Sequence, residues 1–156
     1  MRKKIFSGFI ISFFLIQFLS PKKTNPVAEG KSMNAPANVS AILERSCSDC
    51  HSNKTNWPWY SNIAPVSFFI VNHVIDGRKE LNFSEWETYK EKRKLKKFKE
   101  ICEQVKEGEM PMESYLYVHG NAKLSAEDIT TLCEWATRNG GVEEEEEKET
   151  EKETEK

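Results

Sequence analysis

The sequence predicts an all-α domain made of short helices joined by long loops. Apolar residues in residues 39–141 recur at helical spacing, and no segment alternates cleanly with a period of two. Two stretches, 53–65 and 109–124, look like long loops because they are rich in Asn, Pro and Gly or lack an apolar period. Short helices with such loops bury little apolar surface, and a large apolar cofactor in the core would resolve that difficulty.

The first element, residues 1–21, is an export signal. The basic start MRKK precedes an apolar run from Ile5 to Ser20, and Lys22 and Lys23 follow it. Sixteen residues is near the upper limit for the apolar h-region of a signal peptide and slightly short for a membrane-spanning helix. The run is therefore either a cleaved signal peptide or an uncleaved anchor. Both options predict an exported, periplasmic protein, held at the inner membrane by residues 5–20 in the second case.

Residues 22–38 form a linker, and residues 142–156 form a disordered acidic tail. Positions 143–156 hold nine Glu and three Lys, a net charge of −6, while the whole chain carries −2, which leaves +4 for the rest. This tail is a solvated segment or a contact for a basic partner. The single apolar run excludes a polytopic membrane protein, and a foldable part of about 105 residues argues against a multidomain enzyme.

Four helical segments follow in the folded part. Val39, Ile42 and Leu43 predict a helix over 38–47, capped by Asn38 or Ser40. Pro65 begins an apolar helix that Gly77 ends. Ser84 and Glu87 form a capping box that opens a further helical stretch. The segment 90–107 carries one apolar stripe before the stop at Gly108, made of Leu95, Phe98, Ile101, Cys102 and Val105.

The last helix begins at a cap formed by Ser125 and Asp128 and ends at Gly140 and Gly141. Its inward residues are predicted to be Ile129, Leu132, Cys133 and Ala136. Cys102 and Cys133 lie on the stripes of two helices that can pack together. In an oxidising compartment they form a disulfide, or else they are buried free thiols; the sequence leaves both options open.

The pentapeptide Cys47-Ser48-Asp49-Cys50-His51 is the attachment signature for a c-type haem. Two thiols three residues apart can reach the two vinyl groups of one porphyrin, and Nε2 of the adjacent His51 can bind the iron. A thioredoxin-like dithiol would need flanking strands, which the pattern lacks. A zinc site would need two more ligands, for which only Cys102 and Cys133 are available. The sequence thus predicts one haem, covalently bound through Cys47 and Cys50.

The sixth iron ligand has four candidates. Met110 is favoured because thioether sulfur suits low-spin haem iron and Met110 lies in a loop, Gly-Glu-Met-Pro, that can close over the second face of the ring. Met112, His73 and His119 remain alternatives. His73 lies in the middle of a helix, where a histidine is more often packed than ligating, and His119 is expected to be exposed.

Four segments resemble the haem-binding domain family of small exported c-type proteins: CSDCHSNKTNWPWYSNIAP, HVIDGRKELNFSEW, VKEGEMPMESYLYVH and AKLSAEDITTLCEWA. The resemblance covers residues 39–137. It implies a monohaem, cytochrome-c-like fold with Cys47 and Cys50 as thioether sites, His51 as the proximal ligand and Met110 as the distal ligand. Cys102, Cys133 and the acidic tail lie outside the family pattern.

A closed His–Met iron would make the protein a one-electron carrier for a redox partner protein and not an enzyme. The rivals are a peroxidase-like enzyme and a haem-based sensor or accessory module, each with an exchangeable sixth ligand. An exported protein does not bind nucleic acid.

Other residues are assigned supporting roles around the haem. Trp57, Trp59 and Tyr60 are expected to wall it, segment 82–86 to close its other side, and Arg78 or Lys79 to pair with a propionate. The basic segment 90–99 is a solvated helix face or a docking patch for an acidic partner or an anionic membrane.

Overall fold

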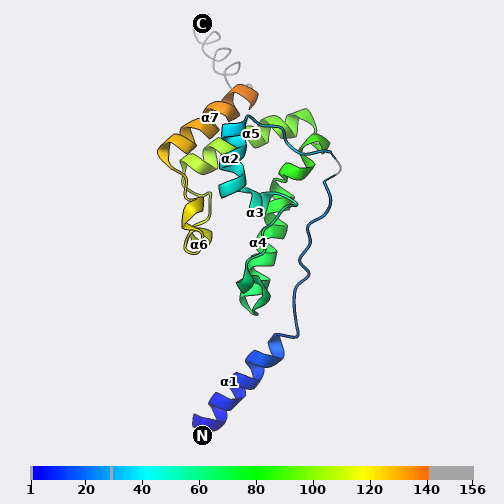
Figure 1. Cartoon of the computed structure of the whole chain (residues 1–156), viewed down its shortest axis with the longest axis vertical. Helices are drawn as coiled ribbons and strands as arrows, with labels where there is room; N and C mark the ends of the chain where they lie inside the picture. The colour runs from blue at the N-terminus through cyan, green and yellow to red at the C-terminus, as the bar shows by residue number, and fades with distance from the viewer. Residues whose placement is uncertain (1, 29, 141–156) are drawn as a thin grey trace, which may run out of the picture.

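The computed structural model describes residues 2–28 and 30–140, so the predicted acidic tail 142–156 lies outside the described residues. The α-helices are α1 (Arg2–Ile16), α2 (Ala37–Ser46), α3 (Ser48–His51), α4 (Val66–Glu80), α5 (Glu91–Lys106), α6 (Glu113–Leu116) and α7 (Ala126–Gly140). The 3₁₀ helices are η1 (Trp59–Asn62), η2 (Phe83–Thr88) and η3 (Gly120–Ala122). The described part contains no strand, which confirms the all-α prediction, and the two predicted long loops hold η1, α6 and η3 (Figure 1).

The core lies where α5 packs along α7. Cys102 and Cys133 are joined by a disulfide between these two helices, which settles the choice that the sequence left open. Phe98 of α5 stands between two tryptophan rings, with its ring centroid 5.0 Å from that of Trp86 and 5.1 Å from that of Trp135. Burial of such large aromatic side chains is a main source of stability in a domain of this size.

Helix α2 covers this pair and leads into the cysteine motif. Its apolar residues Val39, Ile42 and Leu43 are buried, as the periodicity predicts. Arg45 of α2 reaches the start of α7, where its guanidinium lies 2.8 Å from the carboxylate of Asp128. Ser125 and Asp128 exchange hydrogen bonds, from each backbone N–H to the other's side-chain oxygen, so the predicted capping box of α7 is confirmed.

The predicted capping box at Ser84 and Glu87 is wrong. Ser84 lies inside η2, and the side chain of Asn82 caps that turn by accepting a hydrogen bond from the Ser84 N–H. The Ser84 hydroxyl accepts instead from the backbone N–H of Asn53, at 2.9 Å. The Ser84 hydroxyl thus has a tertiary partner 31 residues away in the chain, which local spacing does not reveal.

The basic segment 90–99 is largely ion-paired. Lys94 pairs with Glu87, Lys96 and Lys97 with Glu100, and Lys99 with Glu103. Leu95, predicted to face inward, is 44% exposed, because it lies at the edge of the apolar stripe that Phe98 and Ile101 bury. Because these lysines are already paired with glutamates of the same chain, segment 90–99 is better interpreted as a solvated helix face than as a docking patch for an acidic partner.

Helix α1 extends away from the other helices in Figure 1. Among the described residues, no helix is both long and apolar enough to cross a membrane. The residue after α1, Gln17, is hydrogen-bonded to the body of the protein: its side-chain amide donates to the carbonyl oxygen of Ala64 and its amide oxygen accepts from the Ala64 N–H, at 3.0 and 2.9 Å.

Candidate haem site

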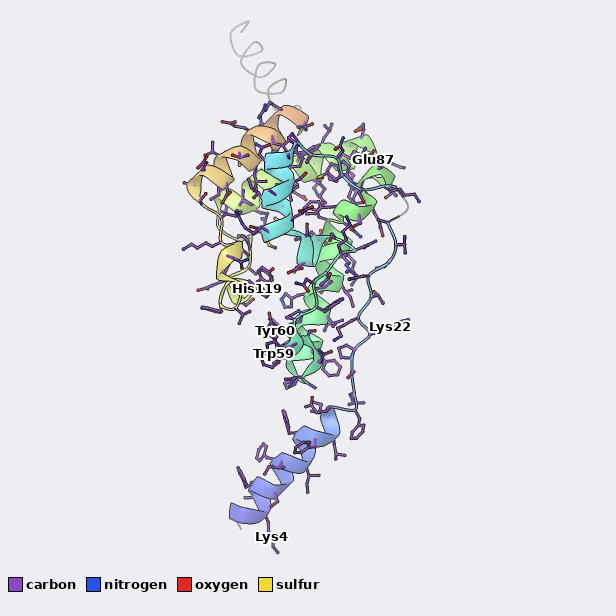
Figure 2. The ribbon with its side chains drawn as sticks, viewed as in Figure 1. Lys4, Lys22, Trp59, Tyr60, Glu87 and His119 are labelled. Carbon is purple, nitrogen blue, oxygen red and sulfur yellow. A yellow bond between two sulfur atoms is a disulfide. The ribbon has the colours of Figure 1, made fainter. Side chains whose placement is uncertain are left out.

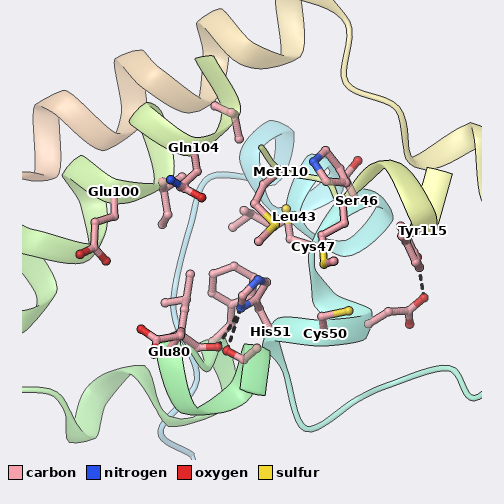
Figure 3. A pocket seen from close by; sticks show the side chains of 18 of the residues that line it. Leu43, Ser46, Cys47, Cys50, His51, Glu80, Glu100, Gln104, Met110 and Tyr115 are labelled. Carbon is pink, nitrogen blue, oxygen red and sulfur yellow. Dashed lines mark hydrogen bonds between the residues drawn. The ribbon is translucent and has the colours of Figure 1, made fainter. Parts of the chain in front are cut away.

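A cavity of about 620 Å³ opens between α3 and α4 on one side and α5, α6 and the segment 107–112 on the other. Its volume lies in the range of sites that hold a cofactor. The apolar part of its wall comes from Leu43, Leu81, Phe83, Ile101, Val105 and Leu132. All four residues predicted to hold the cofactor, Cys47, Cys50, His51 and Met110, line this one cavity (Figure 3).

The cysteine motif is positioned by a single turn of helix. Cys47 ends α2 and caps α3, and its carbonyl oxygen accepts hydrogen bonds from the N–H groups of Cys50 and His51. This turn brings residues 47, 50 and 51 to one side of α3. Both thiols are free, and burial raises the pKa of Cys47 to about 12 and that of Cys50 to about 11. Redox-active dithiols have lowered pKa values, so this environment argues against that alternative.

The ring of His51 is fixed by two backbone carbonyls. Its Nδ1 lies 3.0 Å from the carbonyl oxygen of Gly77 and 3.1 Å from that of Leu81, so Nδ1 carries the proton and donates it. Burial is the largest influence on the His51 pKa and lowers it, which favours the neutral ring. Nε2 therefore keeps its lone pair, and this is the arrangement found for histidines that bind a metal ion.

Gly77 allows α4 to pack directly against the motif. A Cβ atom at this position would lie 2.9 Å from the carbonyl oxygen and 3.2 Å from the Cβ of Cys50. The sequence prediction that Gly77 ends the helix is wrong, because α4 continues to Glu80. The glycine is needed for close approach, and the same approach brings its carbonyl to His51. We call α3 and α4 the proximal wall.

Met110 belongs to the opposite, distal wall, which consists of segment 107–112 and α6. Gly108 ends α5 as predicted, with φ of +74°. The N–H groups of Glu109 and Met110 both donate to the carbonyl oxygen of Gln104, at 3.0 and 3.2 Å, so the backbone of Met110 is fixed to the last turn of α5. Met112 and His73 also line the cavity and remain possible ligands.

Tyr115 of α6 links the distal wall to the cysteine motif. Its hydroxyl donates to the carboxylate of Asp49, at 2.8 Å, and Figure 3 shows this bond beside Cys50. Burial and the hydrogen bond to Asp49 raise the pKa of Tyr115, so the phenol keeps its proton. His119, the last candidate ligand, is half-buried against Tyr115 and not exposed as predicted, and it lines a second cavity of about 530 Å³.

Three observations test whether a haem fits this cavity. Ser46 lines it and holds the single buried side-chain polar atom without a hydrogen-bond partner in the described part of the chain. An unpaired buried hydroxyl costs about 1–3 kcal/mol, so a polar partner inside the cavity is expected. The apolar walls would cover a large ring, and His51 offers a free Nε2 to a metal. The residues fit the group.

A zinc ion does not fit as well. Cys102 and Cys133, the further ligands that zinc would need, are bonded to each other. No group of three or more His, Cys, Asp or Glu side chains suited to a metal ion occurs in the part of the chain that the structure describes.

Several supporting roles predicted for the aromatic and basic residues are wrong. Trp59 is 75% exposed, and it lies with Tyr60 near the end of the body that faces α1 (Figure 2). Arg78 turns away from the cavity: it donates to the carbonyl oxygens of Ser52 and Thr24. Lys79 is paired with Asp76 at the surface. In segment 82–86, by contrast, Phe83 does line the cavity.

Sequence reasoning missed Gly77, Tyr115 and Ser46 as parts of the site. A glycine inside an apolar helical pattern was the signal at Gly77, but such a residue indicates a helix end as readily as a packing contact. Nothing local distinguished Tyr115 or Ser46, because their roles depend on partners far along the chain or on the cavity itself.

The fold and the site define a small all-α protein with an apolar cavity, an oriented imidazole and two free thiols at its wall. The sequence model of a family described as haem-binding domain matches residues 11–138. The chain belongs to this family and is a haem-binding protein, which confirms the resemblance seen in the sequence. No curated protein and no solved structure gives a significant match to it.

Proposed function

We propose that this protein is an exported one-electron carrier with a single c-type haem. The observation that carries the proposal is that His51, with its Nδ1 proton held by two carbonyls, and Met110, with its backbone fixed to α5, line the same cavity. Cys47 and Cys50 would hold the haem by thioether bonds, each formed by adding the S–H group across one vinyl group. Such an addition needs no net oxidant.

When bound, the haem supplies an iron that exchanges one electron between its ferric and ferrous states. His51 and Met110 are the residues that would hold its iron. The carbonyls of Gly77 and Leu81 hold His51 in one tautomer and one orientation. Met110 offers a thioether, which raises the reduction potential, and the apolar walls exclude water, which acts in the same direction. Because His51 and the backbone of Met110 are held in place, we expect the site to rearrange little when it gains or loses an electron.

The first test compares Met110→Ala with Met112→Ala, two methionines of the same wall. We expect the wild-type chain, produced with a cytochrome c maturation system, to show the weak far-red band of a Met–iron bond. Met110→Ala should lose this band, bind carbon monoxide readily and have a lower reduction potential, whereas Met112→Ala should keep all three wild-type properties. The reverse result would assign the sulfur ligand to Met112.

The second candidate is a sensor or a peroxidase-like enzyme with an exchangeable sixth ligand. One observation favours it: His73 lines the same cavity as His51, and its Nδ1 is 2.8 Å from the carbonyl oxygen of Phe69, which leaves Nε2 available. Rapid carbon monoxide binding by the wild-type chain would favour this candidate over the carrier.

A further inference from the structure

Four apolar side chains between the start of η1 and the first turn of α4 are exposed. Trp59 is 75% exposed, Phe69 55%, Val66 44% and Ile63 37%. We call these four residues the apolar end. They lie within eleven consecutive positions of the chain, and exposed groups of this kind mark interaction sites more often than isolated apolar residues do.

The apolar end is attached to the apolar helix α1. Gln17, directly after α1, exchanges two hydrogen bonds with the backbone of Ala64, which lies between Ile63 and Pro65. Lys23 reaches the side chains of Ser61 and Asn62 in the same region. Figure 2 shows Trp59 near the end of the body that faces α1. The apolar end therefore lies on the side of the body to which α1 is attached.

Helix α1 itself requires apolar surroundings. Its exposed side chains include Ile5, Phe6, Phe9, Ile11, Phe13, Phe14 and Leu15. These positions lie around the whole circumference and not along one stripe, which is typical of a helix in lipid. Fifteen helical residues extend only about 22 Å, less than the bilayer core of about 30 Å, so an adjoining apolar surface would be drawn towards the lipid.

The charges near the apolar end suit an anionic lipid surface. No Asp or Glu occurs in residues 1–28 or in residues 50–75, where Lys22, Lys23 and Lys54 are basic. The lining of the cavity, in contrast, includes Glu80, Glu100 and Glu103, although Lys97 there pairs with Glu80 and Glu100. Anionic phospholipids attract clusters of Lys next to an apolar segment. Tryptophan is enriched at the boundary between headgroups and acyl chains.

We propose that the apolar end rests on the surface of the anionic phospholipid bilayer that holds α1. This contact rests on the proposed function of an exported haem protein, with residues 5–20 kept as an uncleaved membrane anchor. With Gln17 holding α1 to Ala64, it fixes the orientation of the haem domain on the membrane, so that a redox partner meets the cavity from a constant direction. We assign lipid and not a second protein to this surface, because α1, the helix attached next to it, is itself apolar and would lie in the same bilayer.

Hydroxyl-radical footprinting of the full-length haem-loaded chain tests this contact. The chain is inserted into vesicles of phosphatidylcholine and phosphatidylglycerol, and oxidation is measured by mass spectrometry at Trp59, Phe69 and, as the internal control, Leu95 of α5. Leu95 is as exposed as Val66 but lies outside the apolar end. We expect Trp59 and Phe69 to react several-fold more slowly in vesicles than in detergent, and Leu95 to react equally in both.

A double variant, Trp59→Asp with Phe69→Asp, should restore rapid oxidation of Val66, while Leu95→Asp should leave the protection of Trp59 unchanged. Unaltered haem spectra verify that each variant folds. Rapid oxidation of Trp59 in a chain that stays vesicle-bound would overturn the contact but leave anchoring intact. A chain that does not bind vesicles would overturn anchoring as well. Protection that rises with protein concentration at constant lipid would assign the surface to a second copy and overturn the lipid contact.

Discussion

The two walls of the haem cavity are built in different ways. The proximal wall is a direct helix-to-helix contact: Gly77 of α4 lies against Cys50, and two carbonyls hold the ring of His51. The distal wall is a loop and one helical turn, fixed by two backbone hydrogen bonds to Gln104 and one from Tyr115 to Asp49. The comparison teaches that His51, the proposed proximal ligand, is preorganised by packing, while Met110, the proposed distal ligand, depends on a few bonds that can be removed singly.

The largest effect is expected for His51→Ala. The variant loses the proposed proximal ligand, which both the motif and the proximal wall position, so we expect a large loss of haem-loaded protein and no low-spin spectrum in what remains. His73→Ala and His119→Ala serve as matched controls and should give normal loading. Absorption spectra of the purified chains measure this. A low-spin His51→Ala protein would show that the proximal wall does not supply the ligand.

Gly77→Ala tests the packing of the proximal wall. Alanine gains up to about 1 kcal/mol in a helix, but its Cβ would lie 2.9 Å from a backbone oxygen that cannot move alone. We expect the clash to cost about 1–3 kcal/mol and to lower the net free energy of unfolding. Gly120→Ala is the control, because nothing lies within 4 Å of its added Cβ. Urea unfolding distinguishes the two, and equal stabilities would refute the tight contact.

Gly77 also illustrates which parts of the site a sequence can reveal. The Cys47–His51 motif and the helices with strong apolar periods, α2, α5 and α7, could be predicted because their signals are local. The close approach at Gly77 could not, since a glycine ends helices and permits contacts equally well. The Ser84 capping box failed for a related reason: Asn82 capped the turn and the Ser84 hydroxyl found Asn53.

Tyr115→Phe tests the weaker, distal wall. It removes the hydrogen bond to Asp49, and we expect a loss of about 0.5–1.5 kcal/mol in the free energy of unfolding. Carbon monoxide binding should accelerate because the loop that carries Met110 loosens. Tyr117→Phe is the control, since it breaks an exposed bond to Glu113. If the binding rate of Tyr115→Phe matches that of the control, α6 does not restrain the distal wall.

The smallest effect concerns Asp128, which supports α2, the helix leading into the proximal wall. Hydrogen bonds from Ser125 are the main cause that lowers its pKa, and Arg45 adds to the effect. Because a carboxylate with a lowered pKa stabilises the fold only while ionised, this contribution is present at neutral pH and is lost as the pH falls below about 4. Melting temperatures should show Asp128→Asn below wild type at pH 7 and closer to it in acid. Asp76→Asn, at an exposed ion pair, should differ little at either pH.

The most direct test of the central claim is the mass of the denatured chain produced with a cytochrome c maturation system. We expect chain plus one haem, resistant to acid–acetone extraction and mapped to the peptide containing Cys47 and Cys50, with one thioether fewer in Cys50→Ala by the pyridine haemochrome spectrum. A chain without haem, or one whose haem is extracted, would contradict covalent attachment at this site.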